Sequence, residues 1–353
     1  MSGLAYARGL AARVRFGGDI PLAPPPTAGL VDSELRGYFS QSDVLIGPSL
    51  TPGLHDSLEG ACARLGIAKE AAPAFVYGSP EVQALCISRT GSDCVIRFSS
   101  GLVDLLDEDE LAFVMGHEIG HFLLGHTVGV PETHLGSIEG QMLRRRQEIS
   151  ADRVGLVACH TLSTAVRALM KTASGLTSRH LRFDVGAFLA QLRHSDEGAS
   201  SRWSTHPSVL VRCRALLWFS MSRTYEGGLS DDRPEELEKL DRRIEYDLER
   251  WTDGPDKLLI EEAETDVVLW TAAARIVATG TFSREEQARA EDLVGTEITD
   301  RLRTFLGALS RDEAESVVAV KLKQAQAHLE QLVPARFGRT ASKLELQVSE
   351  AFR

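Results

Sequence analysis

Apolar residues recur at helical spacing along most of the chain, and one stretch in its first third has the features of short strands. Residues 73–100 are interrupted at Gly78-Ser79-Pro80 and Gly91-Ser92, and segment 93–98 carries β-branched residues, so it is the clearest strand. Helical spacing of apolar residues occurs on both sides of this stretch, at 54–65, 111–122 and 154–166. We therefore expect an α+β fold that is mostly helical and holds a small β-sheet.

After residue 232 the pattern is almost purely helical. Apolar stripes at 237–251 and 267–277 have helical spacing. Ser283 with Glu286, and Ser310 with Glu313, have the form of capping boxes that start two more helices, the second predicted to end at about residue 332. Residues 232–353 are therefore expected to form an all-α bundle of four or more helices.

Composition shifts divide the rest of the chain. Residues 1–30 contain a group of prolines and predict an extended arm. A Gly- and Asp-containing stretch near residues 227–234 marks the start of the bundle. We expect an arm at 1–30, one domain at 31–228 and the bundle at 232–353.

The helix predicted at 111–122 contains the sequence His117-Glu118-Ile119-Gly120-His121. Its start is marked by Asp107 with Glu110 three residues later, the spacing of a capping box. Positions i and i+4 share a helix face, so both imidazoles can reach one metal ion while Glu118 is turned to its side. This His-Glu-x-x-His pattern is typical of zinc peptidases, in which the glutamate is the general base.

A catalytic zinc usually takes a third protein ligand. His126 is near, but the metzincin spacing would need Gly and His where this chain has Leu124 and Thr127; we expect His126 to meet helix-end carbonyls or solvent. Glu148 is the better candidate, because it lies four residues before Asp152 on one face of a second predicted helix. Asp152 would then orient a ligand histidine. The alternative is an exposed helix with two surface acids.

A third motif follows at His206-Pro207, with Arg212 six residues past the histidine. Pro207 suits the first turn of a helix that would also carry Arg212. A zinc hydrolase needs donors for a developing oxyanion, and both residues are of the right type. The alternative is a capping histidine and a solvated arginine.

Together these three motifs resemble the gluzincin metallopeptidases of the HtpX and CAAX prenyl protease type, over roughly residues 55–220. The acidic lead-in at 101–111 is similar as well. The resemblance implies a zincin-type domain in which one Zn²⁺ per chain is bound by His117, His121 and Glu148. It further implies that Glu118 is the catalytic base and that His206 and Arg212 contact the transition state or the substrate carbonyl.

The resemblance also implies that a substrate peptide pairs with an edge strand just before the motif helix. Here that strand would consist of Cys94, Val95, Ile96, Arg97 and Phe98. Members of the family often carry Asn-Ala where this chain has Gln83-Ala84, so a contact made by that asparagine does not carry over.

Net charge and cysteine usage limit the partners and the cellular compartment that we expect. A net charge of −11 argues against nucleic acid and against an anionic membrane surface as partners. The five cysteines are scattered and indicate reduced thiols of an intracellular protein, although Cys86 and Cys94 would be the pair to bridge two strands. No apolar run has the length of a membrane span. We expect a cytoplasmic protein acting on soluble protein or peptide substrates.

The leading hypothesis is an active zinc endopeptidase (a metalloendopeptidase). One alternative is a vestigial peptidase that acts as a binding or scaffold protein through 232–353. Another is a latent peptidase gated by the arm or the bundle. For the bundle itself, we weigh a structural appendage against recruitment of a regulatory partner or self-association.

Overall fold

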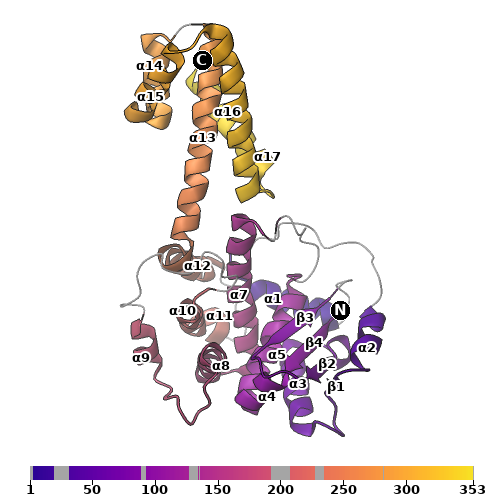
Figure 1. The fold of residues 1–353 in the computed structure, drawn as a ribbon. Coiled ribbons are helices and arrows are strands. Elements are labelled where there is room, and N and C mark those ends of the chain that lie inside the picture. Colours follow the sequence, from indigo (N-terminus) through magenta and orange to yellow (C-terminus); the bar gives the residue numbers. More distant parts are fainter. Residues whose placement is uncertain are drawn as a thin grey trace. The chain divides into compact units, whose positions relative to one another are not determined.

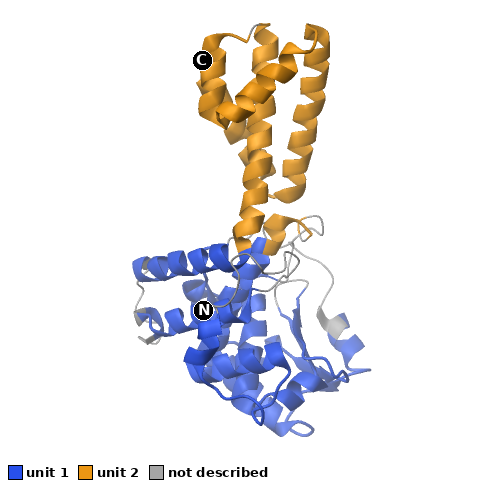
Figure 2. Cartoon of the chain, turned by 60° about the vertical axis from the view of Figure 1, so that its left-hand side comes forward, with its two compact units in different colours: residues 1–130, 142–252 blue, residues 131–141, 253–353 orange. Residues whose placement is uncertain are grey.

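The computed structural model describes residues 3–19, 32–88, 93–126, 134, 136–191, 207–226, 234–280 and 282–352. The chain divides into two compact units (Figure 2), the first made of residues 1–130 and 142–252 and the second of residues 131–141 and 253–353. One small sheet and many helices make up the described ranges. The predicted α+β class is confirmed.

The first unit holds the sheet (Figure 1), with strands β1 Val44–Leu45, β2 Ala74–Tyr77, β3 Ala84–Ile87 and β4 Val95–Ser99. Its helices up to the motif are α1 Gly3–Val14, α2 Asp32–Phe39, α3 Pro52–Leu65, the 3₁₀ turn η1 Lys69–Ala71, α4 Ser100–Leu105 and α5 Glu108–Leu123. After the motif come α7 Ile138–Cys159, α8 Leu162–Ser174, α9 Val185–Ala190, α10 Val209–Ser220, α11 Arg223–Glu226, α12 Pro234–Leu248 and the π-helical turn η3 Glu249–Asp253. The first residues of α7 and the last of η3 belong to the second unit.

The sheet has the strand order β1-β2-β4-β3. Strands β2 and β4 run parallel, and the outer pairs β1–β2 and β3–β4 are antiparallel. On one face, Val95 and Phe75 pack with Phe39 of α2. On the other face, Ile96 and Phe98 belong to the main core, which they share with residues of α3, α5, α7 and α8. Both faces of β4 are therefore buried.

The strand order shows that the expected substrate strand, Cys94–Phe98, is not at an edge of the sheet. Strand β4 is interior, so its backbone groups pair with β2 on one side and β3 on the other. An added peptide has no backbone partner there. Arg97 is also occupied, because its guanidinium lies over the Phe39 and Tyr77 rings and pairs with Asp43 at 2.7 Å. The edge strands are β1 and β3.

The N-terminal segment differs from the expected extended arm. Residues 3–14 form α1, whose inner face is buried, and Phe16 is 1% exposed. The prolines that suggested an arm lie at 21–26, outside the described residues. The helical spacing of the buried positions is the signal for this helix, namely Ala7, Leu10, Ala11 and Val14.

The end of the first unit also lies later than the predicted boundary at 228–232. Helix α12 belongs to this unit, which extends to Thr252. Ile244 and Leu248 of α12 pack with Val211 of α10 and Ile149 of α7. The apolar stripe at 237–251 therefore packs into the core of the first unit.

The second unit consists, in its described part beyond residue 253, of α13 Gly254–Thr279, α14 Arg284–Val294, α15 Thr296–Gly307, α16 Arg311–Leu332 and α17 Phe337–Ala351. Its core includes Ile276 of α13, Leu302 of α15 and Val318 of α16. Both predicted capping boxes are present, at the starts of α14 and α16. Helix α17 was not predicted, because the last expected helix ended at about residue 332. Across the described ranges, no helix has both the length and the hydropathy that a bilayer crossing requires.

Candidate metal centre

Helix α5 begins at the predicted capping box. The Asp107 carboxylate accepts the backbone N–H of Glu110 at 2.9 Å, and the Glu110 carboxylate accepts that of Asp107 at 2.9 Å. Glu110 is fully buried and also pairs with Lys171 and Arg167 of α8. The start of the motif helix is therefore held both by its own cap and by a neighbouring helix.

Glycines let α5 and α7 cross at close range. A Cβ at Gly116 would lie 2.3 Å from the Ala158 Cβ and 3.1 Å from the Gly155 Cα. A Cβ at Gly120 would lie 3.2 Å from the Ala151 Cα. Larger residues would force the two backbones apart. This close approach places Ala151 and Gly155 of α7 against α5, and Glu148 precedes them on the same helix.

Three ligand-type side chains meet at this crossing. The Nε2 atoms of His117 and His121 lie 3.1 Å apart. The Glu148 carboxylate lies 3.3 Å from His121 Nε2 and 3.5 Å from His117 Nε2. One ligand atom from each of the three residues falls within 4.8 Å of the others, so the group could hold a metal ion. Two imidazole nitrogens and one carboxylate oxygen are the donors of a catalytic zinc site that leaves a position open.

Asp152 contacts the first histidine. Its Oδ1 lies 3.0 Å from His117 Nδ1, and Arg212 donates to both of its oxygens, from Nε at 2.8 Å and from Nη2 at 2.6 Å. Burial by itself would raise the pKa of Asp152, but the charge and hydrogen bonds of Arg212, followed by those of His117, outweigh it and lower that pKa. The carboxylate can only accept, so Nδ1 of His117 carries the proton and its Nε2 lone pair is available to a metal.

Arg212 lies between two carboxylates. Besides Asp152, its Nη1 is 3.4 Å from Glu148 Oε2, and its side chain is 13% exposed. The alternative of a solvated arginine is wrong, because the guanidinium links the Glu148 carboxylate to the Asp152 carboxylate that contacts His117. The expected contact of Arg212 with the transition state stays a prediction.

The second histidine is also hydrogen-bonded on the side away from Glu148. His121 Nδ1 lies 2.9 Å from His126 Nδ1, and His126 Nε2 lies 2.8 Å from Asp19 Oδ2. The expectation that His126 meets helix-end carbonyls or solvent is wrong for its ring, since both nitrogens have side-chain partners; its backbone N–H does donate to the His121 carbonyl. Asp19 had not been recognised as a member of the site, and no local motif marks it.

Charges around the second histidine act in opposite directions. Burial disfavours the charged ring of His121, but the hydrogen bond and charge of Glu148 and the charge of Glu118 raise its pKa. For His126, the effect of burial outweighs the effect of Asp19, and its pKa is lowered.

Glu118 follows His117 on α5 and is 8% exposed. His206 lies outside the described residues, whereas Pro207 and Arg212 are described.

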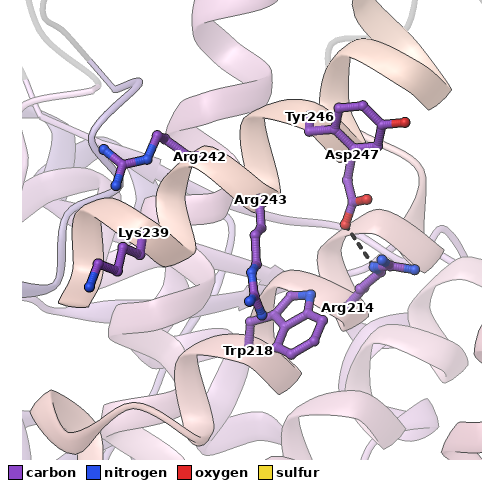
Figure 3. A pocket seen from close by; sticks show the side chains of 7 residues that line it. All are labelled: Arg214, Trp218, Lys239, Arg242, Arg243, Tyr246 and Asp247. Atoms are coloured by element: carbon purple, nitrogen blue, oxygen red, sulfur yellow. Dashed lines mark ion pairs between the residues drawn. The ribbon is translucent and has the colours of Figure 1, made fainter.

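Two other polar sites of the first unit lack this chemistry. A hollow of about 600 Å³ beside α10 and α12 (Figure 3) is lined by Arg214, Trp218, Lys239, Arg242, Arg243, Tyr246 and Asp247. Its one carboxylate is paired with Arg214 at 2.7 Å, as the dashed line in Figure 3 marks. On α3, His55 lies with Asp56 and Glu59, but both acids are exposed and the second nitrogen of the His55 ring contacts Lys69. Among these described groups, only the α5–α7 cluster has buried or half-buried ligands throughout.

Comparisons with known proteins agree with the motifs. Residues 48–139 and 134–218 match peptidase family M48. The plastoglobule-localized metallopeptidase 48, chloroplastic, of Arabidopsis thaliana is 28% identical over 214 residues, which cover 52% of this chain and 62% of that protein. Protease HtpX of Xanthomonas euvesicatoria pv. vesicatoria (strain 85-10) is 38% identical over 53 residues, 15% of this chain and 18% of that protein.

The chain thus spans less than two thirds of the length of these curated relatives. No solved structure matches. The matched ranges contain both motif histidines, Glu148, Asp152 and Arg212. Residues 48–218, which carry these motifs, belong to peptidase family M48, the metallopeptidase type that the motifs predicted.

Proposed function

We propose that this protein is a zinc-dependent endopeptidase that hydrolyses peptide bonds in protein or peptide substrates. In this proposal His117, His121 and Glu148 hold one zinc ion per chain, and Glu118 is the general base. The observation that carries it is the convergence of three ligand atoms within 4.8 Å on two crossing helices. The Nδ1 atoms of both histidines have other partners, which leaves the Nε2 atoms to face Glu148.

A bound zinc ion would supply Lewis acidity that lowers the pKa of a bound water to about 7. Glu118 would accept a proton from the attacking water and return it to the leaving amine. Arg212 would hold Asp152 and Glu148 in place. His206 remains our proposed donor to the developing oxyanion, on the family resemblance alone.

For substrate binding we propose β3 in place of β4. Within the described residues β3 pairs with β4 alone, so its other edge can accept an extended peptide. All four of its residues are half-buried, and the strand packs beside α5. Gln83 comes directly before it and accepts the Tyr77 hydroxyl at 2.9 Å. Backbone pairing along such an edge favours internal segments of a chain and supports endopeptidase action.

The setting of the enzyme is also proposed. None of the five cysteines forms a disulfide, and Cys86 lies opposite Ile96 in the sheet and not opposite Cys94. Cysteines without disulfides support the expected cytoplasmic location. For the second unit we propose binding of a regulatory partner or self-association. It has a hollow of about 780 Å³ whose lining includes Trp270 and Phe305, aromatic residues of the kind enriched at interfaces.

The test is zinc content and casein cleavage on the same purified samples. Glu118→Gln should keep one zinc per chain and lose at least about 100-fold in cleavage rate, because a general base contributes about 10²–10⁴-fold. His117→Ala and Glu148→Ala should lose zinc. His180→Ala, at an exposed histidine, is the matched control and should change neither.

Cleavage by zinc-loaded Glu118→Gln at the wild-type rate would refute the base assignment. Zinc without cleavage in the full chain and in variants lacking residues 1–30 or 232–353 would favour the scaffold alternative. Cleavage that appears only in a shortened chain would favour a latent enzyme.

A further inference from the structure

The hydrogen bonds behind the second histidine extend beyond the region that matches the family. His126 follows the end of α5, and Asp19 precedes the matched range that starts at residue 48. The side chains of His126 and Asp19 are 4% and 1% exposed. A buried carboxylate, a buried imidazole and His121 therefore form one chain of contacts, at 2.8 Å and 2.9 Å.

The proton positions along these hydrogen bonds follow from Asp19, because its carboxylate can only accept. A carboxylate has no proton to give, so His126 donates from Nε2 to Asp19. In the neutral ring the remaining nitrogen, Nδ1, then has a lone pair. It can accept only if His121 carries its proton on Nδ1. That tautomer leaves the lone pair of His121 on Nε2, the atom that lies 3.3 Å from Glu148.

A carboxylate thus determines the tautomer of each motif histidine, directly for His117 and through a second ring for His121. Asp152 accepts directly from His117 Nδ1 at 3.0 Å. Asp19 reaches His121 through the ring of His126. In metal sites, partners of this type fix the tautomer and the ring orientation of a ligand histidine.

Asp19 is held in place by both α7 and α12. The Phe16 N–H donates to Ser150 Oγ at 3.1 Å, and Gly17 N–H donates to Asp241 Oδ2 at 2.8 Å. Arg153 donates to the Val14 carbonyl at 3.2 Å and lies over the Phe16 ring. The Asp19 N–H closes the turn on the Phe16 carbonyl at 2.9 Å.

These anchors are buried and lie close to the metal-ligand cluster along the sequence of α7. Ser150 and Arg153 are fully buried and follow Glu148 by two and five residues on α7. Arg153 also pairs with Asp241 of α12 at 2.5 Å. The helix that supplies a carboxylate to the cluster therefore also holds the segment that carries Asp19.

We propose that Asp19 is a positioning residue for the metal centre, which acts through His126 to keep the Nε2 lone pair of His121 directed at the ion. This inference rests on the proposed zinc function. It makes the N-terminal segment, residues 3–19, a working part of the peptidase and not an arm beside it.

The test measures zinc affinity of the full-length chain by competition with a chromophoric chelator. Asp19→Leu removes the acceptor and should weaken zinc binding about 10–100-fold. Asp19→Asn keeps an amide oxygen that can accept from His126, so it should restore most of that affinity. Leu10→Ala, on the same segment but outside the hydrogen-bond chain, is the control for loss of stability. It should lower the melting temperature and leave zinc affinity unchanged.

A second readout needs no substitution. In the zinc-loaded wild-type chain, ¹⁵N NMR of the imidazoles should find a proton on Nδ1 of His121 and the metal on Nε2. Metal on Nδ1 would overturn the proposal. Equal zinc affinity of Asp19→Leu and wild type would overturn it as well, and so would an equal loss in Leu10→Ala.

Failure of the underlying function has a different signature. If wild-type protein bound no zinc, the metallopeptidase assignment itself would fail before any variant was compared. If wild type bound zinc and cleaved casein while Asp19→Leu bound it equally well, only the role of Asp19 would be lost.

Discussion

The crossing of α5 and α7 can be tested at Gly116, where the structure leaves no room for a methyl group. The added Cβ of Gly116→Ala would lie 2.3 Å from the Ala158 Cβ and 3.1 Å from the Gly155 Cα. The second contact is with backbone, so no side-chain rotation relieves it. Overpacking costs about 1–3 kcal/mol, and this clash belongs at the upper end.

Helix propensity acts in the opposite direction. Replacing glycine by alanine inside a helix stabilises it by up to about 1 kcal/mol. The net loss in unfolding free energy should therefore be about 2 kcal/mol. For a unit of this size that corresponds to a fall in melting temperature of about 4–8 °C. Moving α7 away from α5 would also carry Glu148 from the histidines and weaken zinc binding.

Differential scanning calorimetry on matched variants decides the question. Gly60→Ala is the control, because Gly60 lies inside α3 and the nearest atoms to its added Cβ belong to the flexible Arg64 guanidinium, at 3.5 Å or more. It should raise the melting temperature by about 2–4 °C, since it gains helix propensity without a clash. If Gly116→Ala were as stable as wild type or rose with the control, the close-crossing argument would be refuted.

Three further outcomes follow from buried contacts. Arg212→Lys keeps the charge but loses the two-pronged contact with Asp152, so zinc affinity measured by chelator competition should fall about 10–100-fold; an unchanged affinity would contradict the role given to the guanidinium. Lys171→Met leaves the fully buried Glu110 with Arg167 as its remaining cationic partner and should cost about 3 kcal/mol in urea unfolding, whereas a loss below about 1 kcal/mol would show that the pair contributes little. Burial raises the pKa of the Cys62 and Cys213 thiols to about 12, so iodoacetamide at neutral pH should label them only after unfolding, and labelling of either in the folded chain would show that it is accessible.

Residues close together in sequence were predictable from spacing. The motif histidines, Glu118, and the pair Glu148 and Asp152 follow from i, i+4 geometry, and the start of α5 follows from its capping box. These features depend on local helix geometry. The approach of α7 to α5 could be suspected from Gly120 but not placed, because close packing needs both helices.

Features that depend on distant pairing were not predictable in the same way. The family resemblance implied an edge strand just before the motif helix, but β3, which comes from earlier in the chain, pairs with β4 on that side. Asp19 lies 107 residues from His126, and no local pattern connects them. The apolar stripe of α12 could have packed in the core of either unit, and the sequence alone does not distinguish the two.

The most direct test of the proposed zinc site is anomalous diffraction at the zinc absorption edge, from crystals of the full chain purified with zinc. We predict one anomalous peak per chain, bonded to Nε2 of His117, Nε2 of His121 and a carboxylate oxygen of Glu148. A peak at the other candidate group on α3, formed by His55, Asp56 and Glu59, or the absence of any peak in protein that cleaves casein, would contradict the proposed site.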